Sequence, residues 1–423
     1  MATLIRDLTL TEDPCRLVVL ASLTGSGWSN EITSRADLCQ GPVVARPGRV
    51  TEELIGRRSA TSERIPSLDG LRAVSIGLVL LAHLVGTRAF PLTVESSRVL
   101  ALGELGVHVF FVISGFLITR LLLDELGRTG RISLGGFYFR RTMRIFPAYY
   151  VFLLLLGGMA WSGVVRLSPR DLSHALTYTS NYFSARSWLI GHTWSLSVEE
   201  QFYVLWPALL VMTGRRRALW FAALAVAAAP MIRLASWELM RSSGDGIGHR
   251  FETVADAIAI GCVLAGTRDW LHQQPVYRRL LESPLFVAVP CLAVAGSLLY
   301  DHPVAHFLIG MSVMNLSIAA TLDWCVTFGS GRVGRVLNWG PIAFVGTISY
   351  SLYLWQQLFL NRTSAAPTAA FPLNLALAAA AALTSYYLIE QPALRLRRRL
   401  ETVWRRPVAG VRRGWLTRTS AAR

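Results

Sequence analysis

The chain contains no lysine, so all 42 of its basic residues are arginine, and its formal net charge is +16. It has few charges overall: 16% of the residues are charged, 52% are hydrophobic, and the mean hydropathy is +0.42. This composition is too apolar for an ordinary soluble protein of 423 residues and indicates several membrane-crossing segments. A nucleic-acid-binding protein could carry the same charge, but these arginines lie in short loops between apolar runs. We therefore interpret them as a topology signal and expect no nucleic acid partner.

Cysteine is scarce, and its five positions follow no pattern that a disulfide framework or a metal site would need. No pair is spaced as CxxC and no spacing is typical of metal ligands, so we expect no bound metal. The sequence also lacks the basic leader of a cleavable signal peptide, because acidic residues precede its first apolar patch. We expect residues 1–63 to be a poorly ordered cytoplasmic extension. The cysteines are Cys15, Cys39, Cys262, Cys291 and Cys325.

Apolar runs long enough to cross a bilayer occupy most of the remaining chain. A membrane-spanning helix needs about 20 mainly apolar residues, with roughly 17 to 25 tolerated. Ten runs come near that length, so the predicted fold is all-α, a polytopic bundle of about ten transmembrane helices within 64–392. An Arg-rich cytoplasmic tail over 393–423 follows. The runs are 71–87, 105–124, 145–165, 197–213, 218–236, 252–267, 284–300, 305–326, 342–361 and 370–389.

The distribution of arginine predicts which loops face the cytoplasm, because cytoplasmic loops retain basic residues. Loops rich in arginine alternate with loops poor in it along the bundle. With ten helices, this alternation places both termini in the cytoplasm. It also makes 166–196 an extracytoplasmic loop or a re-entrant element. We therefore expect a multi-pass protein of the inner (plasma) membrane.

The first predicted helix carries two ionisable side chains, Arg72 and His83. They lie eleven residues apart, which is about three turns and about 16 Å along a helix axis, so both point the same way. Arg72 could simply snorkel to the lipid interface, and His83 could be a hydrogen-bonded packing residue. Ionisable groups within a span are functional by default, however, and seldom face lipid. This pattern favours a functional pair.

Two arginines three positions apart, Arg141 and Arg144, share a helical face near the cytoplasmic border, and Arg140 lies beside them. Anchoring at the membrane surface would explain any one of them. The array as a whole favours a phosphate clamp, because the planar guanidinium group matches phosphate geometry. We predict that it binds an anionic part of a substrate.

A carboxylate pair, Glu199 and Glu200, opens the fourth predicted span in the stretch HTWSLSVEEQFYVLWP. We expect both at the extracytoplasmic surface, at about the depth of His83. A carboxylate beside an imidazole fixes its tautomer and stabilises its charged form, as general base catalysis on a hydroxyl requires. Acidic residues also suit a helix N-terminus, where they offset the dipole, and that explanation holds for one of the two.

Other polar residues inside the spans are weaker candidates. His108 lies near the outer end of the second span. Ser114 and Gly115 lie in its middle, where small residues usually allow close helix packing. Asp256 and Asp323 are intramembrane acids, and each could simply pair with an arginine. We rank His108 below His83, and both aspartates below Glu200.

Five motifs of this chain resemble, in the same order, those of acyltransferase family 3, the integral-membrane O-acyltransferases. The resemblance covers residues 64–399, and the conserved order of five motifs makes it highly specific. It implies a ten-helix membrane enzyme that moves an acyl group, often acetyl, from cytoplasmic acyl-CoA to a hydroxyl of an extracytoplasmic glycan or sugar-bearing molecule. The motifs are LDGLRAVSIGLVLLAH, GVHVFFVISGFLIT, FRRTMRIFPAYY, HTWSLSVEEQFYVLWP and GTISYSLYLWQQ, with a closing IEQP.

The resemblance also implies roles for six of the residues above. One position departs from the family: after SYSLYLW the family often has histidine, whereas this chain has Gln356, which cannot act as an acid or base. The family's motifs imply that arginines bind the donor and that a histidine and a glutamate carry the chemistry. The donor-binding residues would then be Arg72, Arg141 and Arg144, and the catalytic ones His83, Glu200 and Glu199.

These residues predict one mechanism and leave one alternative. Phosphates of the donor, acyl-CoA and most simply acetyl-CoA, dock at the arginines. His83, oriented by Glu200, then removes the proton of a carbohydrate hydroxyl or carries the acyl group itself; the residues do not separate these roles. A transporter or flippase without covalent chemistry would also have ten helices and midspan charges. Against it, the chain shows no repeated halves and few spans broken by Gly or Pro near the centre.

Overall fold

The computed structural model describes residues 65, 67–92, 96–240 and 247–404. Within these ranges every regular element is helical and no β-strand occurs. The predicted all-α class is therefore confirmed for the described part of the chain. The predicted extension over 1–63 and most of the predicted tail lie outside these residues.

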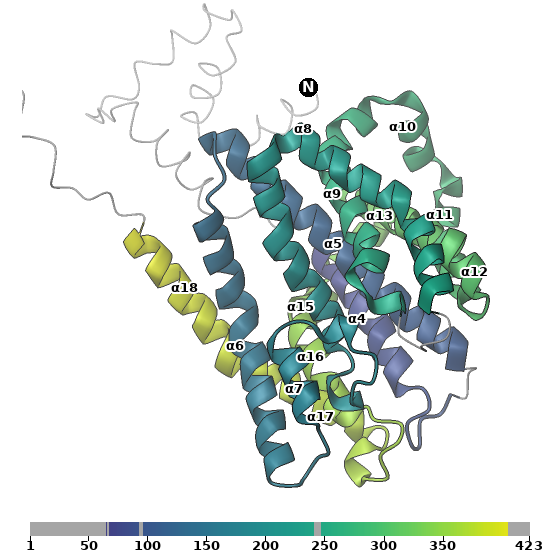
Figure 1. The fold of residues 1–423 in the computed structure, drawn as a ribbon. Helices are drawn as coiled ribbons and strands as arrows, with labels where there is room; N and C mark the ends of the chain where they lie inside the picture. The colour runs from purple at the N-terminus through teal and green to yellow at the C-terminus, as the bar shows by residue number, and fades with distance from the viewer. Residues whose placement is uncertain (1–64, 66, 93–95, 241–246, 405–423) are drawn as a thin grey trace, which may run out of the picture. The chain divides into compact units, whose positions relative to one another are not determined.

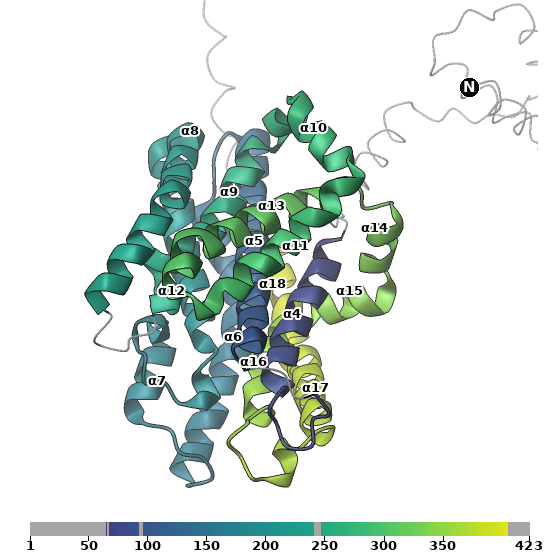
Figure 2. The same cartoon turned by 90° about the vertical axis from the view of Figure 1, so that its right-hand side faces the viewer.

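The α-helices follow one another along the chain, with short 3-10 or π-helical turns between some of them (Figure 1, and turned by 90° in Figure 2). They are α4 (Leu68–Leu84), α5 (Ser96–Thr129), α6 (Leu134–Trp161), α7 (Pro169–Leu176), α8 (Thr193–Met240), α9 (Phe251–Gln273), α10 (Pro275–Glu282), α11 (Ala288–Ser297), α12 (Pro303–Ala305), α13 (Met311–Thr327), α14 (Arg332–Leu337), α15 (Gly340–Thr347), α16 (Ser349–Phe359), α17 (Leu373–Ser385) and α18 (Gln391–Trp404). The short turns are η2 (Ser180–Tyr182), η3 (Trp188–Ile190), η4 (Ile247–His249), η5 (Pro284–Val287), η6 (Leu298–Asp301), η7 (His306–Gly310), η8 (Pro367–Ala369) and η9 (Tyr386–Glu390).

Several of these helices are long and apolar enough to cross a membrane, which indicates a multi-pass membrane protein. The remaining predicted spans fall on α4, with 17 residues, on α9, with 23, and on the short helices α15 and α16. The number of crossings and the side that each terminus faces therefore stay predictions. Among the described residues, six helical runs meet the length and hydropathy of a span: Arg98–Thr129, Leu134–Trp161, Trp188–Met240, Pro284–Asp301, Pro303–Thr327 and Leu373–Thr402.

Helix α8 contains two of the predicted spans, separated by a break at Gly214. This residue has φ 77° and ψ 163°, a backbone conformation that glycine adopts without steric cost. Directly after the break, Arg215 donates a hydrogen bond to the carbonyl oxygen of Gly266 in α9, at 2.9 Å. The two halves of α8 match the predicted runs 197–213 and 218–236.

Helix α5 packs closely against α9 through its central glycine. A Cβ atom added at Gly115 would lie 2.0 Å from the carbonyl oxygen of Ile258, so a larger residue would push the two helices apart. Close packing is the structural role predicted for this position. Ser114, directly before it, lines a cavity described below.

The two acids predicted to pair with an arginine, Asp256 and Asp323, both do so. Asp256 forms an ion pair with Arg233, and both side chains are buried. Asp323 accepts hydrogen bonds from Arg268 Nε at 2.5 Å and from the Tyr277 hydroxyl at 2.8 Å. Buried charges are stable only when they are paired in this way.

Candidate active site

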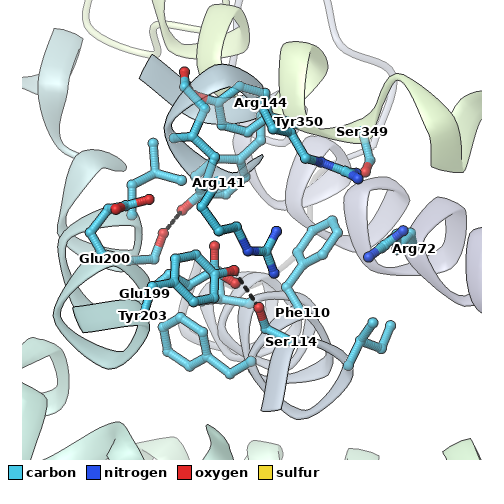
Figure 3. Close-up of a pocket in the computed structure, with 17 residues that line it drawn as sticks. Arg72, Phe110, Ser114, Arg141, Arg144, Glu199, Glu200, Tyr203, Ser349 and Tyr350 are labelled. Carbon is cyan, nitrogen blue, oxygen red and sulfur yellow. Dashed lines mark hydrogen bonds between the residues drawn. The ribbon is translucent and has the colours of Figure 1, made fainter. Parts of the chain in front are cut away.

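A cavity of about 100 Å³ between α4, α5, α6, α8 and α16 brings together five of the six predicted site residues (Figure 3). We call it the arginine cavity. Three guanidinium groups and two carboxylates from three different helices, α4, α6 and α8, line it, together with hydroxyl groups of serine and tyrosine. The predicted residues that meet here are Arg72, Arg141, Arg144, Glu199 and Glu200.

Aromatic and polar neighbours hold these side chains in place. The guanidinium carbon of Arg141 lies 4.2 Å from the ring centroid of Tyr203, a cation–π contact. The hydroxyl of Tyr203 hydrogen-bonds to the Ser114 hydroxyl of α5. Arg72 NH1 lies 3.4 Å from an oxygen of Asp69, one turn earlier in α4. These contacts orient two of the three guanidinium groups.

The neighbours of the carboxylate pair differ from the prediction, which put Glu199 and Glu200 beside His83. Helix α8 begins at Thr193, four residues before the predicted start of its span. The pair therefore lies about two turns, or roughly 10 Å, inside the helix. Helix α6 likewise begins at Leu134, so its arginines also lie well inside. Both sets line the arginine cavity.

His83 lines a second, larger cavity of about 540 Å³, which we call the histidine cavity. Two of its lining residues, Val107 and Tyr353, also line the arginine cavity, so the two cavities adjoin. The hydroxyl of Tyr353 is anchored at this boundary: it donates to the carbonyl oxygen of His192 at 3.1 Å and lies 2.6 Å from the Ser195 hydroxyl. One aromatic side chain thus forms part of the wall between the two sites.

Gln357, not Glu200, is the polar partner of His83, which corrects the predicted pairing. The Oε1 atom of Gln357 accepts the backbone N–H of His192 at 3.0 Å and its ring Nδ1–H at 2.7 Å. A backbone N–H can only donate, so the amide NH₂ group must be the end that faces His83 Nε2, at 3.1 Å. His83 therefore carries its proton on Nδ1, which donates to the Val79 carbonyl at 2.8 Å.

This hydrogen-bond pattern leaves the lone pair of His83 on Nε2, the nitrogen beside Gln357. A neutral imidazole in this tautomer can take a proton at Nε2. The Trp188 ring packs edge-on against His83, with ring centroids 5.6 Å apart. Its indole N–H donates to the main-chain carbonyl oxygen of Gln357 at 3.2 Å. The imidazole is therefore held from three sides.

The segment 166–196 supplies part of the histidine cavity through its last residues, which include Arg186 and Trp188. Arg186 donates to the carbonyl oxygens of Ser180 and Phe183, each at 2.6 Å, and to His249 Nδ1 at 2.9 Å. Burial lowers the pKa of Arg186 to about 10, so it stays charged at neutral pH. Burial, and then the charge of Arg186, lower the pKa of His249 to about 4, so this imidazole is neutral and accepts the hydrogen bond.

Comparison with known protein families assigns the part of the chain that forms both cavities. A family model described as an acyltransferase domain matches residues 65–390. The chain belongs to acyltransferase family 3. This match confirms the resemblance that the five motifs carry, and it spans both cavities.

Two relatives illustrate what this acyltransferase family member is similar to. A Bacillus subtilis protein named "Putative peptidoglycan O-acetyltransferase YrhL" is 30% identical over 325 residues, 69% of this chain and 48% of the relative. The Listeria monocytogenes peptidoglycan O-acetyltransferase OatA is 24% identical over 344 residues, 71% of this chain and 50% of the relative. The chain thus spans about half the length of the curated relatives it matches. No solved structure shows significant similarity to it.

Sequence reasoning about this acyltransferase missed Gln357 and considered its neighbour instead. Gln356 is fully buried, and its amide has no hydrogen-bond partner in the described part of the chain. Successive residues of a helix point about 100° apart, so only one of two adjacent glutamines can face His83. The two adjacent glutamines, Gln356 and Gln357, were the available signal in the sequence, but their adjacency does not show which of them faces the site.

Replacing Gln357 with glutamate tests the assigned tautomer of His83. The carboxylate can still accept both hydrogen bonds from His192, but its second oxygen would face His83 Nε2 and favour the protonated imidazole. We expect acyl transfer at neutral pH to fall about 10-fold or more and to recover as the pH rises. The measurement is the pH–rate profile of the variant beside that of the wild type; an unchanged profile would contradict the assignment. Gln356→Glu is unsuited as a control because it buries a charge, so Gln356→Leu serves instead.

Proposed function

We propose that this chain is an O-acyltransferase of the inner (plasma) membrane that transfers an acyl group from cytoplasmic acyl-CoA to a hydroxyl of an extracytoplasmic glycan. The observation that carries the proposal is the pair of adjoining cavities in one helix bundle. One is lined by three arginines, and the other contains a histidine whose Nε2 lone pair faces the amide of Gln357. The printed names of the relatives support acetyl as the acyl group and peptidoglycan as the acceptor.

The arginine cavity suits the phosphates of the donor. Arg72, Arg141 and Arg144 offer planar groups of N–H donors that match phosphate oxygens, and together they would offset much of the donor's charge. A space of about 100 Å³ has room for a phosphate-sized group but not for a whole acyl-CoA. The thioester arm would therefore extend from this cavity past Tyr353 toward His83.

The two carboxylates of the arginine cavity also have a part in this proposal. The pantetheine arm of acyl-CoA carries amide N–H groups, which need acceptors once they leave water. Glu200 has a buried carboxylate oxygen, Oε1, without a hydrogen-bond partner among the described residues. We assign it to accept such an N–H, with Glu199 balancing the charge of the arginines before the donor arrives.

The transfer itself would proceed at His83 Nε2. This nitrogen removes the proton of the acceptor hydroxyl, and the oxygen attacks the carbonyl carbon of the thioester. The carbon–sulfur bond breaks, and the proton passes from the imidazolium to the leaving sulfur. The products are an ester and the free thiol of CoA, so atoms and charges balance.

Incubating the purified chain with radiolabelled acetyl-CoA and soluble peptidoglycan glycan strands tests the proposal. We expect label to become attached to the glycan in a form that mild alkali releases, as it does from an ester. A transporter or flippase would leave the acetyl-CoA intact and the glycan unlabelled, and that result would contradict the proposed function.

A further inference from the structure

Glu104 of α5 lines the histidine cavity together with His83, and no step of the proposed transfer uses it. The two side chains are brought close by helix packing. Gly103 directly precedes Glu104 in α5, and Ala82 directly precedes His83 in α4. These two residues lie against each other where the helices pack, because a Cβ atom added at Gly103 would lie 2.7 Å from the Cβ of Ala82. Glu104 is therefore an ionisable group beside the reaction centre, in the same chamber as the predicted base.

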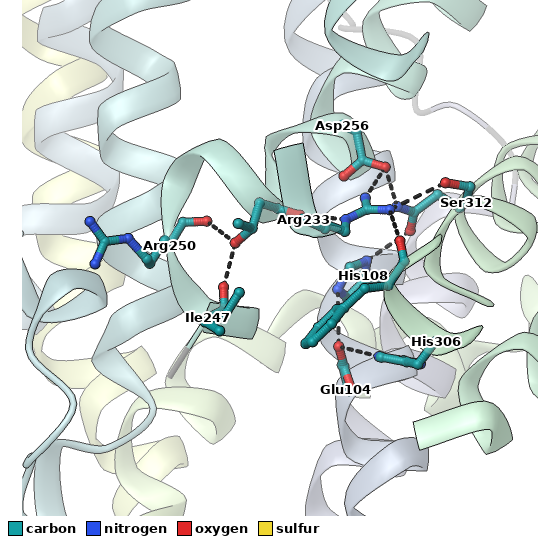
Figure 4. Close-up of polar contacts among 11 residues, drawn as sticks. Glu104, His108, Arg233, Ile247, Arg250, Asp256, His306 and Ser312 are labelled. Carbon is teal, nitrogen blue, oxygen red and sulfur yellow. Dashed lines mark hydrogen bonds and ion pairs between the residues drawn. The ribbon is translucent and has the colours of Figure 1, made fainter. Parts of the chain in front are cut away.

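Two imidazole rings flank the carboxylate of Glu104 (Figure 4). Its Oε1 atom lies 3.7 Å from His108 Nε2 and 3.5 Å from His306 Nε2. The Glu104 side chain is 15% exposed, whereas those of His108 and His306 are 0% and 3% exposed. Of the three groups, the carboxylate is the most exposed, and it lines the cavity.

A chain of hydrogen bonds behind Glu104 sets the tautomer of His108. Asn315 donates its amide N–H to Asp256 at 3.0 Å, so its oxygen must accept the Nδ1–H of His108, at 2.7 Å. A neutral His108 therefore turns its Nε2 lone pair toward Glu104. A neutral His108 thus donates no hydrogen bond to Glu104, and the carboxylate stays available to hydrogen-bond a ligand.

A buried ion pair fixes the far end of this chain. Arg233 is fully buried and pairs with Asp256, and it also donates to the Thr253 carbonyl at 2.7 Å and to the Ser312 hydroxyl at 3.2 Å. The network thus ties α5 to α8, α9 and α13 behind the cavity (Figure 4). His306 lies on the π-helical turn η7, and such turns are frequent at functional sites. This support preorganises the carboxylate.

The rest of the histidine cavity has the character of a binding site for a carbohydrate. The indole rings of Trp188, Trp194 and Trp237 line it, and they offer flat apolar surfaces to the C–H faces of a sugar ring. Arg186 adds a hydrogen-bond donor on the wall. An apolar cavity with a few fixed polar groups is the usual form of a small-molecule site.

We propose that Glu104 binds a second hydroxyl group of the acceptor sugar, so that the hydroxyl to be acylated lies at His83 Nε2. The inference rests on the proposed function, because it assigns the acceptor to the cavity of His83. A carboxylate is a strong acceptor for sugar hydroxyls, and two fixed contacts on one ring determine which hydroxyl reacts. Glu104 is thereby a specificity-determining residue for the acceptor.

Glu104→Gln tests the proposal in the purified full chain, with acetyl-CoA as donor and soluble peptidoglycan glycan strands as the acceptor probe. The amide is isosteric and can donate to His108 Nε2, so the network behind it is preserved. Losing a charge-assisted hydrogen bond should raise the KM for the glycan about 10- to 100-fold, while the KM for acetyl-CoA changes less than about twofold. Quenching of tryptophan fluorescence by the glycan should show the same loss of affinity without any turnover.

The matched control is Glu125→Gln on the same helix, because Glu125 pairs with Arg140 outside both cavities; this variant should keep both KM values. Equal changes in both KM values of Glu104→Gln, or an unchanged glycan KM and affinity, would overturn the proposal. Wild-type protein that transfers no acyl group would contradict the proposed function, whereas the fluorescence titration would still decide the role of Glu104. If Glu104→Gln does not fold, Glu104→Asp, which keeps the charge but withdraws it, should show the same selective loss of glycan affinity.

Discussion

Replacing His83 with alanine is expected to lower acyl transfer to the glycan about 10²- to 10⁴-fold, the usual contribution of a general base. The variant keeps the arginine cavity, so its affinity for acetyl-CoA should stay within about threefold of the wild type. The measurement is steady-state transfer of labelled acetyl groups, combined with equilibrium binding of acetyl-CoA. A large loss in rate with little loss in donor binding is the pattern of a group that acts in the transition state.

His174→Ala is the matched control for this variant. His174 hydrogen-bonds to the Thr179 hydroxyl at 2.9 Å and lines neither cavity, so its loss should leave the rate close to that of the wild type. If His83→Ala transferred acetyl groups at the wild-type rate while folding normally, His83 would not be the base. Acetyl label bound to wild-type protein without acceptor would instead indicate that the imidazole carries the acyl group.

The second large effect is expected for the double variant Arg141→Gln, Arg144→Gln. Each arginine that loses charge-assisted hydrogen bonds to a phosphate should raise the KM for acetyl-CoA about 10- to 100-fold. The affinity for the glycan should change little, because it binds in the other cavity. The measurement is the KM of each substrate, determined with the other at saturation.

Acetyl-pantetheine, which lacks the phosphates, distinguishes phosphate binding from a general structural role. The wild type should prefer acetyl-CoA strongly, and the double variant should lose that preference while using acetyl-pantetheine as well as before. Arg140→Gln is the control, because Arg140 pairs with Glu125 and lies outside the arginine cavity. A double variant that still prefers acetyl-CoA by the wild-type factor would contradict the assignment.

Most of the helical fold could be predicted from the sequence, because hydropathy is a local property. The apolar runs coincide with helices, Gly214 interrupts α8 between two predicted spans, and Gly115 packs against α9 as its small size suggested. Asp256 and Asp323 pair with arginines because bare charges are too costly inside a membrane. Each of these outcomes follows from the residue itself and its nearest neighbours in the chain.

The surroundings of the carboxylate pair could not be predicted in the same way. The polar start of α8, TWSLS, is helical and buried among other helices, so counting apolar residues put the helix start four residues too late. An error of one turn was enough to place Glu200 beside His83 rather than in the cavity of Arg141. Hydropathy reports exposure to lipid, and it does not register a polar helical turn that protein covers.

Contacts between distant segments form the remaining part that the sequence could not predict. Gln357 meets His83 across 274 positions of sequence, and Glu104 meets His306 through the packing of α5 against η7. No spacing rule connects such residues, since helix packing alone brings them together. His108, ranked low from its position, proves to be one support of Glu104.

The most direct test of the account is transfer across the membrane by one protein. Purified chain is reconstituted into vesicles that hold soluble peptidoglycan glycan strands inside, and labelled acetyl-CoA is added outside. Because the donor and acceptor cavities adjoin within one bundle, we predict ester-linked label on the enclosed glycan while acetyl-CoA stays outside, and no label with His83→Ala. Intact acetyl-CoA inside the vesicles with unlabelled glycan would contradict the account, and so would labelling confined to glycan on the same side as the donor.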